Sequence, residues 1–213
     1  MITKFLSGIL LAVLLSCKAK TIPTINTVRF SPSEEIQKSK DLKKADEFYS
    51  LFNVEHGEVA SIEKIDRNVR FKDSINFRLW LVNSNFSKFE LYSIKFTDLK
   101  WEGIYCSLIR QEEYAGGKII LQISEIKNIV PKAGWKYFDD SLNKLQVFSL
   151  PDSDSIPEIN NTWALTNNIF VEASKGEKYR FYSYPDSESY LDKSGQTRRV
   201  SEIRNLFESE LHD

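Results

Sequence analysis

Side chains that commonly perform catalysis or bind metals are scarce in this chain. Its histidines are His56 and His212, and its cysteines are Cys17 and Cys106. A serine or cysteine nucleophile needs a base within hydrogen-bond reach, usually a histidine, but His56 falls in a predicted turn and His212 is the penultimate residue. Histidines so far apart, with so few cysteines, also fall short of a zinc ligand set. We therefore expect no metal, no cofactor and no histidine-assisted nucleophile.

Carboxylates are the other candidates for acid–base chemistry. They occur as adjacent pairs at Glu34-Glu35, Glu112-Glu113 and Asp139-Asp140. Adjacent side chains point away from each other on a strand or a helix, whereas the two acids of a glycosidase face each other across a cleft. We interpret these pairs as surface charge. A carboxylate-dependent hydrolase of glycans or cell-wall polymer stays open as an alternative function.

The segment Tyr179–Pro185 is the one local composition that suggests a binding surface. Alternation along a strand separates its side chains into two faces, one of which carries Arg180, Tyr182 and Tyr184. Aromatic rings beside a guanidinium can stack on sugars or peptides, so these residues form the candidate binding surface. The structural alternative, which we favour, is a strand with one face in the core and its tyrosine-rich face partly covered by the terminal helix.

A second local pattern suggests a modification site. Asp154-Ser155-Ile156 lies among prolines and acidic residues that are typical of an exposed loop. The triplet is similar to the Asp-Ser/Thr-apolar pattern that Bacteroidota use for O-glycosylation of exported proteins. This similarity makes Ser155 the candidate acceptor.

The first seventeen residues indicate where the protein acts. A lysine precedes an apolar block over residues 5–15, which is the layout of a secretory signal and is too short to span a bilayer. The ending Leu14-Leu15-Ser16-Cys17 is similar to a bacterial lipobox. That resemblance implies a signal peptide over residues 1–16 and a lipid on Cys17. We expect an exported protein that is anchored to a cell-envelope membrane, the outer membrane by preference, with the side it faces left open.

Composition excludes one class of partner and shapes the stability argument. The formal net charge is −1 and the charges are interspersed, whereas nucleic-acid binding needs clustered lysine and arginine. We therefore expect no nucleic-acid partner. With Cys17 assigned to the lipid, Cys106 has no disulfide partner, and its alternating, strand-like surroundings predict a buried, inert thiol. The domain must then depend on its core, to which an aromatic content of 13% contributes.

The elements that must position these residues follow from hydrophobic periodicity. Residues 17–40 carry Pro, Thr, Ser and mixed charges without sustained periodicity, which predicts a tether, and residues 41–213 form a single domain. A subdivision near residue 130, into a β-rich part and a C-terminal αββα part, stays open. Period 3.6 predicts helices and period 2 predicts strands. The predicted helices are 41–52, 133–145 and 200–211, and the predicted strands fall within 58–125 and at 163–165, 169–173 and 178–184.

These elements predict an α+β fold. Short connections between successive strands favour an antiparallel β-sheet meander, with one core face and one wetter face. An N-terminal helix docks on the domain. Another helix precedes a small C-terminal three-stranded meander, and a terminal helix ends the chain.

The lipobox, the Lys- and Asn-rich composition and a C-terminal run together resemble the small uncharacterised lipoproteins of Bacteroidota. The resemblance implies an envelope location and a similar architecture, and it carries no activity. It rests on Pro131, Gly134-Trp135, Phe138, Leu142, Leu150-Pro151, Val171-Glu172 and Tyr179–Pro185.

Few catalytic side chains and many aromatic ones favour a function in binding. We expect a membrane-anchored, non-enzymatic module for a protein or glycan ligand. An immunity or inhibitor lipoprotein directed against an exported toxin is a second hypothesis.

The lipid anchor is directly testable. Replacing Cys17 by serine (Cys17→Ser) removes the only thiol that the lipobox offers. Acyl labelling should be lost, and so should membrane fractionation that resists an alkaline wash, which strips proteins held only by surface contact. The Cys106→Ser variant is the matched control and should retain both properties. A Cys17→Ser chain that is still acylated would refute the anchor.

Overall fold

The computed structural model describes residues 32–50, 75–111, 120–157, 159, 167–176, 178–186 and 194–211. Cys17, His56 and His212, the signal peptide and the strand expected at 163–165 lie outside these residues. The helices are α1 (Pro32–Ser50), α3 (Trp135–Lys144) and α4 (Gly195–Leu211), with a short 3₁₀ turn, η1 (Ser153–Ser155). The strands are β1 (Ile75–Val82), β2 (Lys88–Thr97), β3 (Lys100–Gln111), β4 (Ile120–Asn128), β5 (Asn167–Lys175) and β6 (Lys178–Asp186).

All six strands join one antiparallel sheet in the order β4-β3-β2-β1-β5-β6. The predicted α+β class with an antiparallel meander is therefore confirmed. Strands β1 to β4 form the meander, and the β5–β6 hairpin adds to its free edge through β1. The hairpin was expected to belong to a separate small meander, but it extends the same sheet. No subdivision near residue 130 is present in the described chain, because both parts share the sheet.

Helix α1 begins earlier than its sequence pattern suggests. It starts at Pro32, so the predicted tether of residues 17–40 overlaps its first half. Proline is well suited to the first helical position because its missing N–H has no partner there in any case. Residues 32–40 were assigned to the tether because they show no sustained apolar periodicity, yet they form the first half of this helix.

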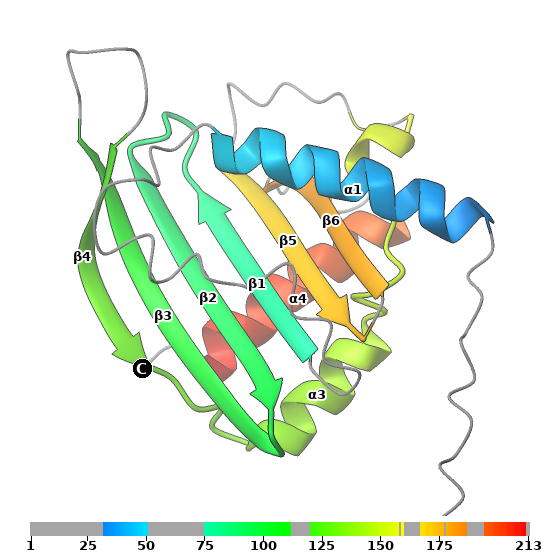
Figure 1. Ribbon diagram of the computed structural model, residues 1–213. Helices are drawn as coiled ribbons and strands as arrows, with labels where there is room; N and C mark the ends of the chain where they lie inside the picture. The colour runs from blue at the N-terminus through cyan, green and yellow to red at the C-terminus, as the bar shows by residue number, and fades with distance from the viewer. Residues whose placement is uncertain are drawn as a thin grey trace, which may run out of the picture. The chain divides into compact units, whose positions relative to one another are not determined.

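The sheet carries a core on each of its faces, where one wetter face was expected. Helix α1 crosses one face, and α3 and α4 lie behind the other (Figure 1). Alternation along β1 sends Phe77 and Leu79 to the side of α3 and α4, and Trp80 and Val82 to the side of α1. A second core was not expected because α1 carries only a short apolar stripe.

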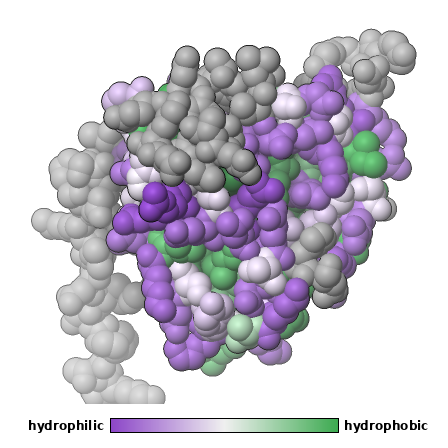
Figure 2. All heavy atoms as spheres, turned by 180° about the vertical axis from the view of Figure 1, so that it is seen from behind, coloured by the Kyte–Doolittle hydropathy of each residue, from purple (hydrophilic) through white to green (hydrophobic). Residues whose placement is uncertain are grey.

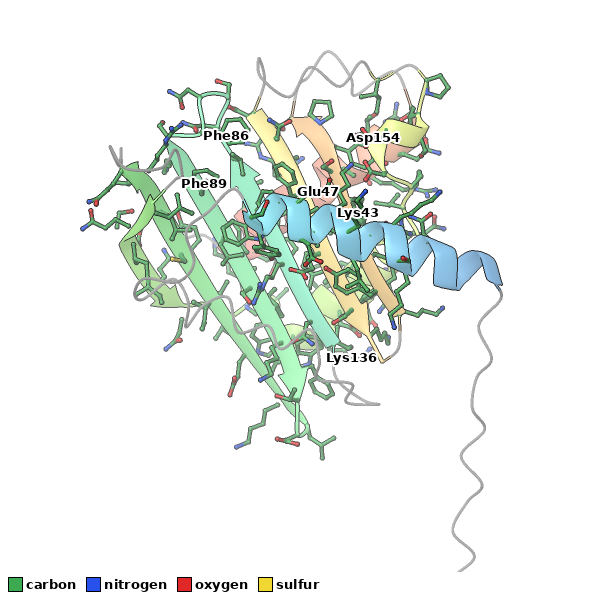
Figure 3. All side chains as sticks on the ribbon, turned by 45° about the horizontal axis from the view of Figure 1, so that its top comes forward. Lys43, Glu47, Phe86, Phe89, Lys136 and Asp154 are labelled. Carbon is green, nitrogen blue, oxygen red and sulfur yellow. The ribbon has the colours of Figure 1, made fainter. Side chains whose placement is uncertain are left out.

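The stripe of α1 is aromatic and packs closely on the sheet. The Phe48 ring lies 4.3 Å from the ring of Phe170 and 5.7 Å from those of Trp80 and Phe181, centroid to centroid. Lys43 and Glu47 lie on the solvent side of the helix (Figure 3). Such ring pairs add stabilisation beyond the area that they bury.

A buried charge pair lies beneath α1 at the junction of the two halves of the sheet. Arg78 of β1 and Glu172 of β5 are direct cross-strand partners, and each side chain is 2% exposed. Their charged groups approach to 3.7 Å. The Tyr49 hydroxyl of α1 donates to Glu172 at 2.5 Å and accepts from Arg78 Nη1 at 3.1 Å. The Tyr179 hydroxyl of β6 donates to the other Glu172 oxygen at 2.7 Å.

The network ties three elements to one carboxylate. Burial, and then the charge of Glu172, raise the pKa of Tyr49 well above its ordinary value, which keeps that hydroxyl protonated as a donor. Asp41 of α1 adds a second tie, since it accepts from Arg180 Nε at 2.7 Å. Lys44 of α1 adds a third tie, since its Nζ lies 2.6 Å from Asp152 Oδ2. Polar bonds thus set where α1 lies, and apolar packing holds it there.

The buried pair makes a stability prediction. Glu172→Ala leaves Arg78 buried without its carboxylate, which should lower the free energy of unfolding by about 3–5 kcal/mol. The double variant Arg78→Met with Glu172→Leu removes both charges and should lose clearly less than Glu172→Ala alone. Urea unfolding measures both, and Asp140→Asn on the exposed side of α3 is the control that should leave stability unchanged. Equal losses in the single and double variants would contradict a role for the charge pair.

Candidate functional site

The predicted binding surface on β6 is not an exposed surface. Tyr182 and Tyr184 are buried, and their hydroxyls donate to the carbonyl oxygens of Val147 at 3.0 Å and Pro151 at 2.7 Å. The segment before η1 therefore covers this face of the strand. Arg180 is engaged as well, since it donates to Asp41 and to the Leu150 carbonyl. The favoured alternative, a strand with its tyrosine face covered, describes what is observed. Residues 147–151 bond the two hydroxyls, and the terminal helix packs in the same core, as expected.

Ser155 lies in η1 and is exposed. Its hydroxyl donates to the Asp152 carbonyl at 2.6 Å. The expected loop is therefore a short 3₁₀ turn with an accessible serine. O-glycosylation of Ser155 stays a prediction.

Cys106 of β3 is fully buried. Burial raises the pKa of its thiol to about 11, so the reactive thiolate is scarce at neutral pH. Within the described ranges, no three His, Cys, Asp or Glu side chains come close enough to hold a metal ion. Neither thiol chemistry nor a metal centre therefore guides the choice of a site in this part of the chain.

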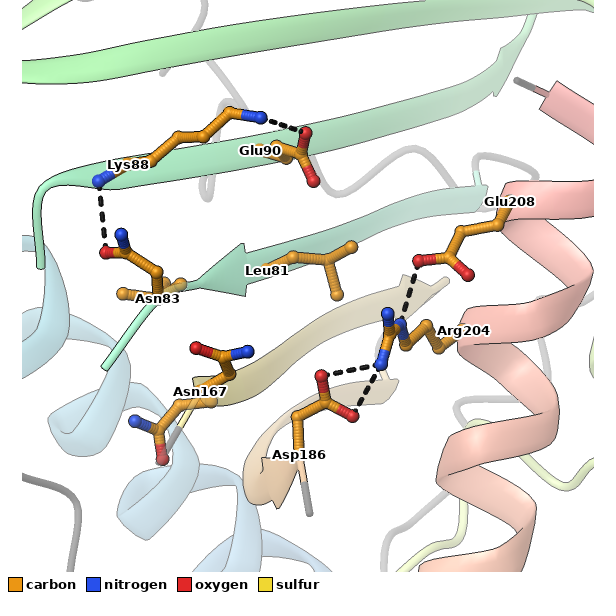
Figure 4. A pocket seen from close by; sticks show the side chains of 10 residues that line it. Leu81, Asn83, Lys88, Glu90, Asn167, Asp186, Arg204 and Glu208 are labelled. Carbon is orange, nitrogen blue, oxygen red and sulfur yellow. Dashed lines mark hydrogen bonds and ion pairs between the residues drawn. The ribbon is translucent and has the colours of Figure 1, made fainter. Parts of the chain in front are cut away.

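A polar pocket opens where β1 ends, β5 begins and α4 passes β6 (Figure 4). Its volume is about 410 Å³, its open mouth included. Charged and amide side chains make up most of its wall, over a small apolar floor. The lining residues are Leu81, Val82, Asn83, Lys88, Glu90, Asn167, Asn168, Asp186, Arg204 and Glu208.

Arg204 of α4 organises one wall. Its Nη1 lies 2.7 and 2.6 Å from the two carboxylate oxygens of Asp186, and its Nε donates to Glu208 at 2.8 Å. Burial lowers the pKa of Arg204, but the hydrogen bond to Glu208 and the charge of Asp186 outweigh this and raise it. A fixed guanidinium between two carboxylates attaches α4 to the end of β6 and points polar groups toward the pocket.

The opposite wall comes from the β1–β2 turn. Lys88 Nζ lies 2.8 Å from Glu90, which also accepts from the Tyr105 hydroxyl at 3.1 Å. Asn83 Oδ1 accepts from the backbone N–H of Lys88 at 3.0 Å, and Asn167 Oδ1 accepts from the N–H of Ser84 at 3.0 Å. Asn83 Nδ2 donates in turn to Ser87 Oγ at 2.8 Å. These bonds hold both amide groups in fixed positions.

The pocket offers fixed donors and acceptors whose charges are paired within it. Arg204 lies between Asp186 and Glu208, and Lys88 lies against Glu90. Sequence analysis missed the site because its walls come from the meander, the hairpin and α4. The only local signal is the spacing of Arg204 and Glu208, four residues apart on one helix face.

Neither a protein-family model nor a curated protein matches the chain. Among the helices that the structure describes, none has the length and apolarity needed to cross a bilayer.

The burial of Cys106 makes a reactivity prediction. In the Cys17→Ser chain, where Cys106 is the only thiol, a disulfide reagent such as DTNB should leave the native protein unlabelled at pH 8. The same reagent should label one thiol per chain in unfolding concentrations of urea. Rapid labelling of the native protein would contradict both the burial and the raised pKa.

Proposed function

We propose that this protein is a non-enzymatic binding module, anchored to the membrane through Cys17, and that its pocket binds a glycan. The observation that carries the proposal is the convergence of paired carboxylates, cations and amides from three strands, the β1–β2 turn and α4 in one pocket. The ligand site thereby moves from the buried tyrosines of β6 to the far end of the β1–β5 junction. Export to the outer membrane, inferred from the lipobox resemblance, belongs to the same proposal.

Charge pairing within the pocket favours a neutral ligand. Each cation already lies against a carboxylate, and three carboxylates against two cations leave a net charge of −1 on the lining. An anionic ligand would meet this excess, and a cationic one would compete with Arg204 and Lys88 for their partners. A neutral ligand avoids both costs.

A sugar matches the pocket group by group. Each sugar hydroxyl can donate to a carboxylate or amide oxygen of the pocket and can accept from an amide or guanidinium N–H group. Leu81 supplies an apolar floor for the C–H face of a ring. A few placed polar groups over apolar contact is the general pattern of small-ligand sites.

One observation favours a second candidate, the carboxylate-dependent hydrolase. Glu90, Asp186 and Glu208 come from β2, β6 and α4 and line the same pocket, so acids from separate elements do meet. A general acid must bring a proton to the leaving group. Asp186 and Glu208 instead accept N–H bonds from Arg204, which suits binding better than proton donation.

The proposal predicts glycan binding that depends on the pocket. The full chain, tested on an array of bacterial and host oligosaccharides, should retain at least one neutral glycan. Glu90→Gln and Asn167→Ala should each weaken binding of the best oligosaccharide about tenfold or more, since each loses placed hydrogen bonds. Asp140→Asn, which lies on α3 outside the pocket, should bind as the parent chain does.

Three outcomes decide between the candidates. Loss of binding with unchanged urea unfolding supports the pocket, whereas retention of no glycan, or equal binding by all variants, overturns it. Mass spectrometry of the same oligosaccharides after incubation tests hydrolysis. Cleavage that Glu90→Gln or Asp186→Asn abolishes would replace the binding function by the enzymatic one.

A further inference from the structure

The turn between β2 and β3 displays a leucine in a strained backbone conformation. Leu99 is 90% exposed, and both Asp98 and Leu99 have positive φ, at 51° and 63°. Asparagine, aspartate and glycine tolerate this left-handed region, but a bulky residue there is uncommon. The turn keeps a large apolar side chain in water where a polar residue would fit better. Such an outlier points to a function for the side chain.

An aromatic cluster supports the turn from behind. The Trp101 ring stacks on Trp135 of α3 with centroids 5.4 Å apart and planes 7° apart, and Phe96 lies 4.9 Å from Trp101. Gly103 lets this packing form, because a Cβ there would come within 2.9 Å of Trp135 and 2.7 Å of the Ile129 carbonyl oxygen. The turn is therefore held rigidly at its position.

Other exposed apolar side chains lie at the same end of the molecule. Val130 is 67% exposed and follows Ile129, and Tyr137 is 51% exposed in the first turn of α3. Figure 1 shows the β2–β3 turn beside the start of α3, and Figure 2 shows apolar side chains reaching the surface at this lower end. We call this surface, made of Leu99, Trp101, Val130, Trp135 and Tyr137, the apolar tip.

The shape and composition of the apolar tip fit a lipid surface. A stable protein interface needs about 800 Å² of complementary surface on each partner, whereas here a single leucine protrudes from a narrow turn. Tryptophan and tyrosine are the residues enriched at the membrane–water interface. Exposed lysines surround the tip and can extend their ammonium groups to the phosphates; they are Lys95, Lys100, Lys132 and Lys136.

We infer that the apolar tip inserts into the interfacial layer of a phospholipid bilayer. Asp98 and Glu102 lie among the lysines, and Lys136 is paired with Asp140 at 2.8 Å. Four lysines against these three acids leave a net charge of only +1, so apolar contact supplies most of the attraction. Leu99 would enter the acyl boundary, with Trp101 at the level of the headgroups. This inference depends neither on the lipid at Cys17 nor on the pocket.

Insertion of the tip would orient the pocket. Strand β2 runs from Lys88, which lines the pocket, to Thr97 at the turn. Its ten residues span roughly 33 Å at the usual rise of a strand. The pocket would then open at the end of the domain away from the bilayer, where a ligand can reach it.

Vesicle binding by the Cys17→Ser chain without residues 1–16 tests the inference, since this variant lacks both the proposed lipid and the apolar block of the predicted signal peptide. The vesicles contain phosphatidylethanolamine and phosphatidylglycerol with brominated acyl chains, which quench tryptophan fluorescence on contact. We expect quenching, and about a tenfold or greater loss of partitioning in Leu99→Asn, as expected for keeping a leucine side chain out of an apolar phase. Partitioning should change little with the phosphatidylglycerol fraction.

Leu99→Asn separates function from folding. Asparagine suits the positive φ at this position, so the variant should unfold at a higher urea concentration while it binds vesicles less. Ile109→Asn is the matched control, because Ile109 is an exposed apolar residue on β3 outside the tip. Equal partitioning of Leu99→Asn and the parent, or absence of quenching, would overturn the inference. Self-association that Leu99→Asn abolishes, without vesicle binding, would assign the tip to a protein contact and also overturn it.

Discussion

The buried pair of Arg78 and Glu172 is the constraint on which the described structure depends. It joins β1 to β5, two strands that are far apart in the sequence and whose pairing unites the meander with the hairpin. A slip of one residue would carry Arg78 to the opposite face, which holds the apolar core of Phe77 and Leu79. Burying two charges is a weak source of net stability. Its effect here is specificity, because only one register of β1 against β5 brings the two charges together. The Glu172 carboxylate also accepts hydrogen bonds from Tyr49 of α1 and Tyr179 of β6.

The pocket inherits its geometry from that register. Val82 and Asn168 are cross-strand partners at the end of the β1–β5 ladder. The residues just beyond this pair, Asn83 and Asn167, lie on one wall of the opening, where Asn167 accepts from the N–H of Ser84. Arg204 completes the wall by binding Asp186, the last residue of β6. The meander, the hairpin and α4 thus contribute one wall each. The pocket exists only when all three are assembled in the correct register.

Local patterns predicted local structure well and predicted partners poorly. Period-two alternation located strands β1 to β3, and helical spacing located α3 and the core of α4, because each pattern reports which face of an element is buried. The tyrosines of β6 were placed on the correct faces, but what covers them, residues 147–151, is distant in sequence. Arg78 and Glu172 gave no signal at all, since a charged residue within a strand is usually solvated. The pocket was missed for the same reason.

The central claim is that the end of the β1–β5 junction is where this protein meets its ligand. The most direct measurement is an NMR titration of the isotope-labelled full chain with the oligosaccharide that binds it most tightly. The account predicts that amide shifts concentrate at Asn83, Asn167, Asp186 and Arg204, with the strands of the far sheet edge unchanged. Shifts that cluster instead on β4, or on the outer side of α1, would contradict it.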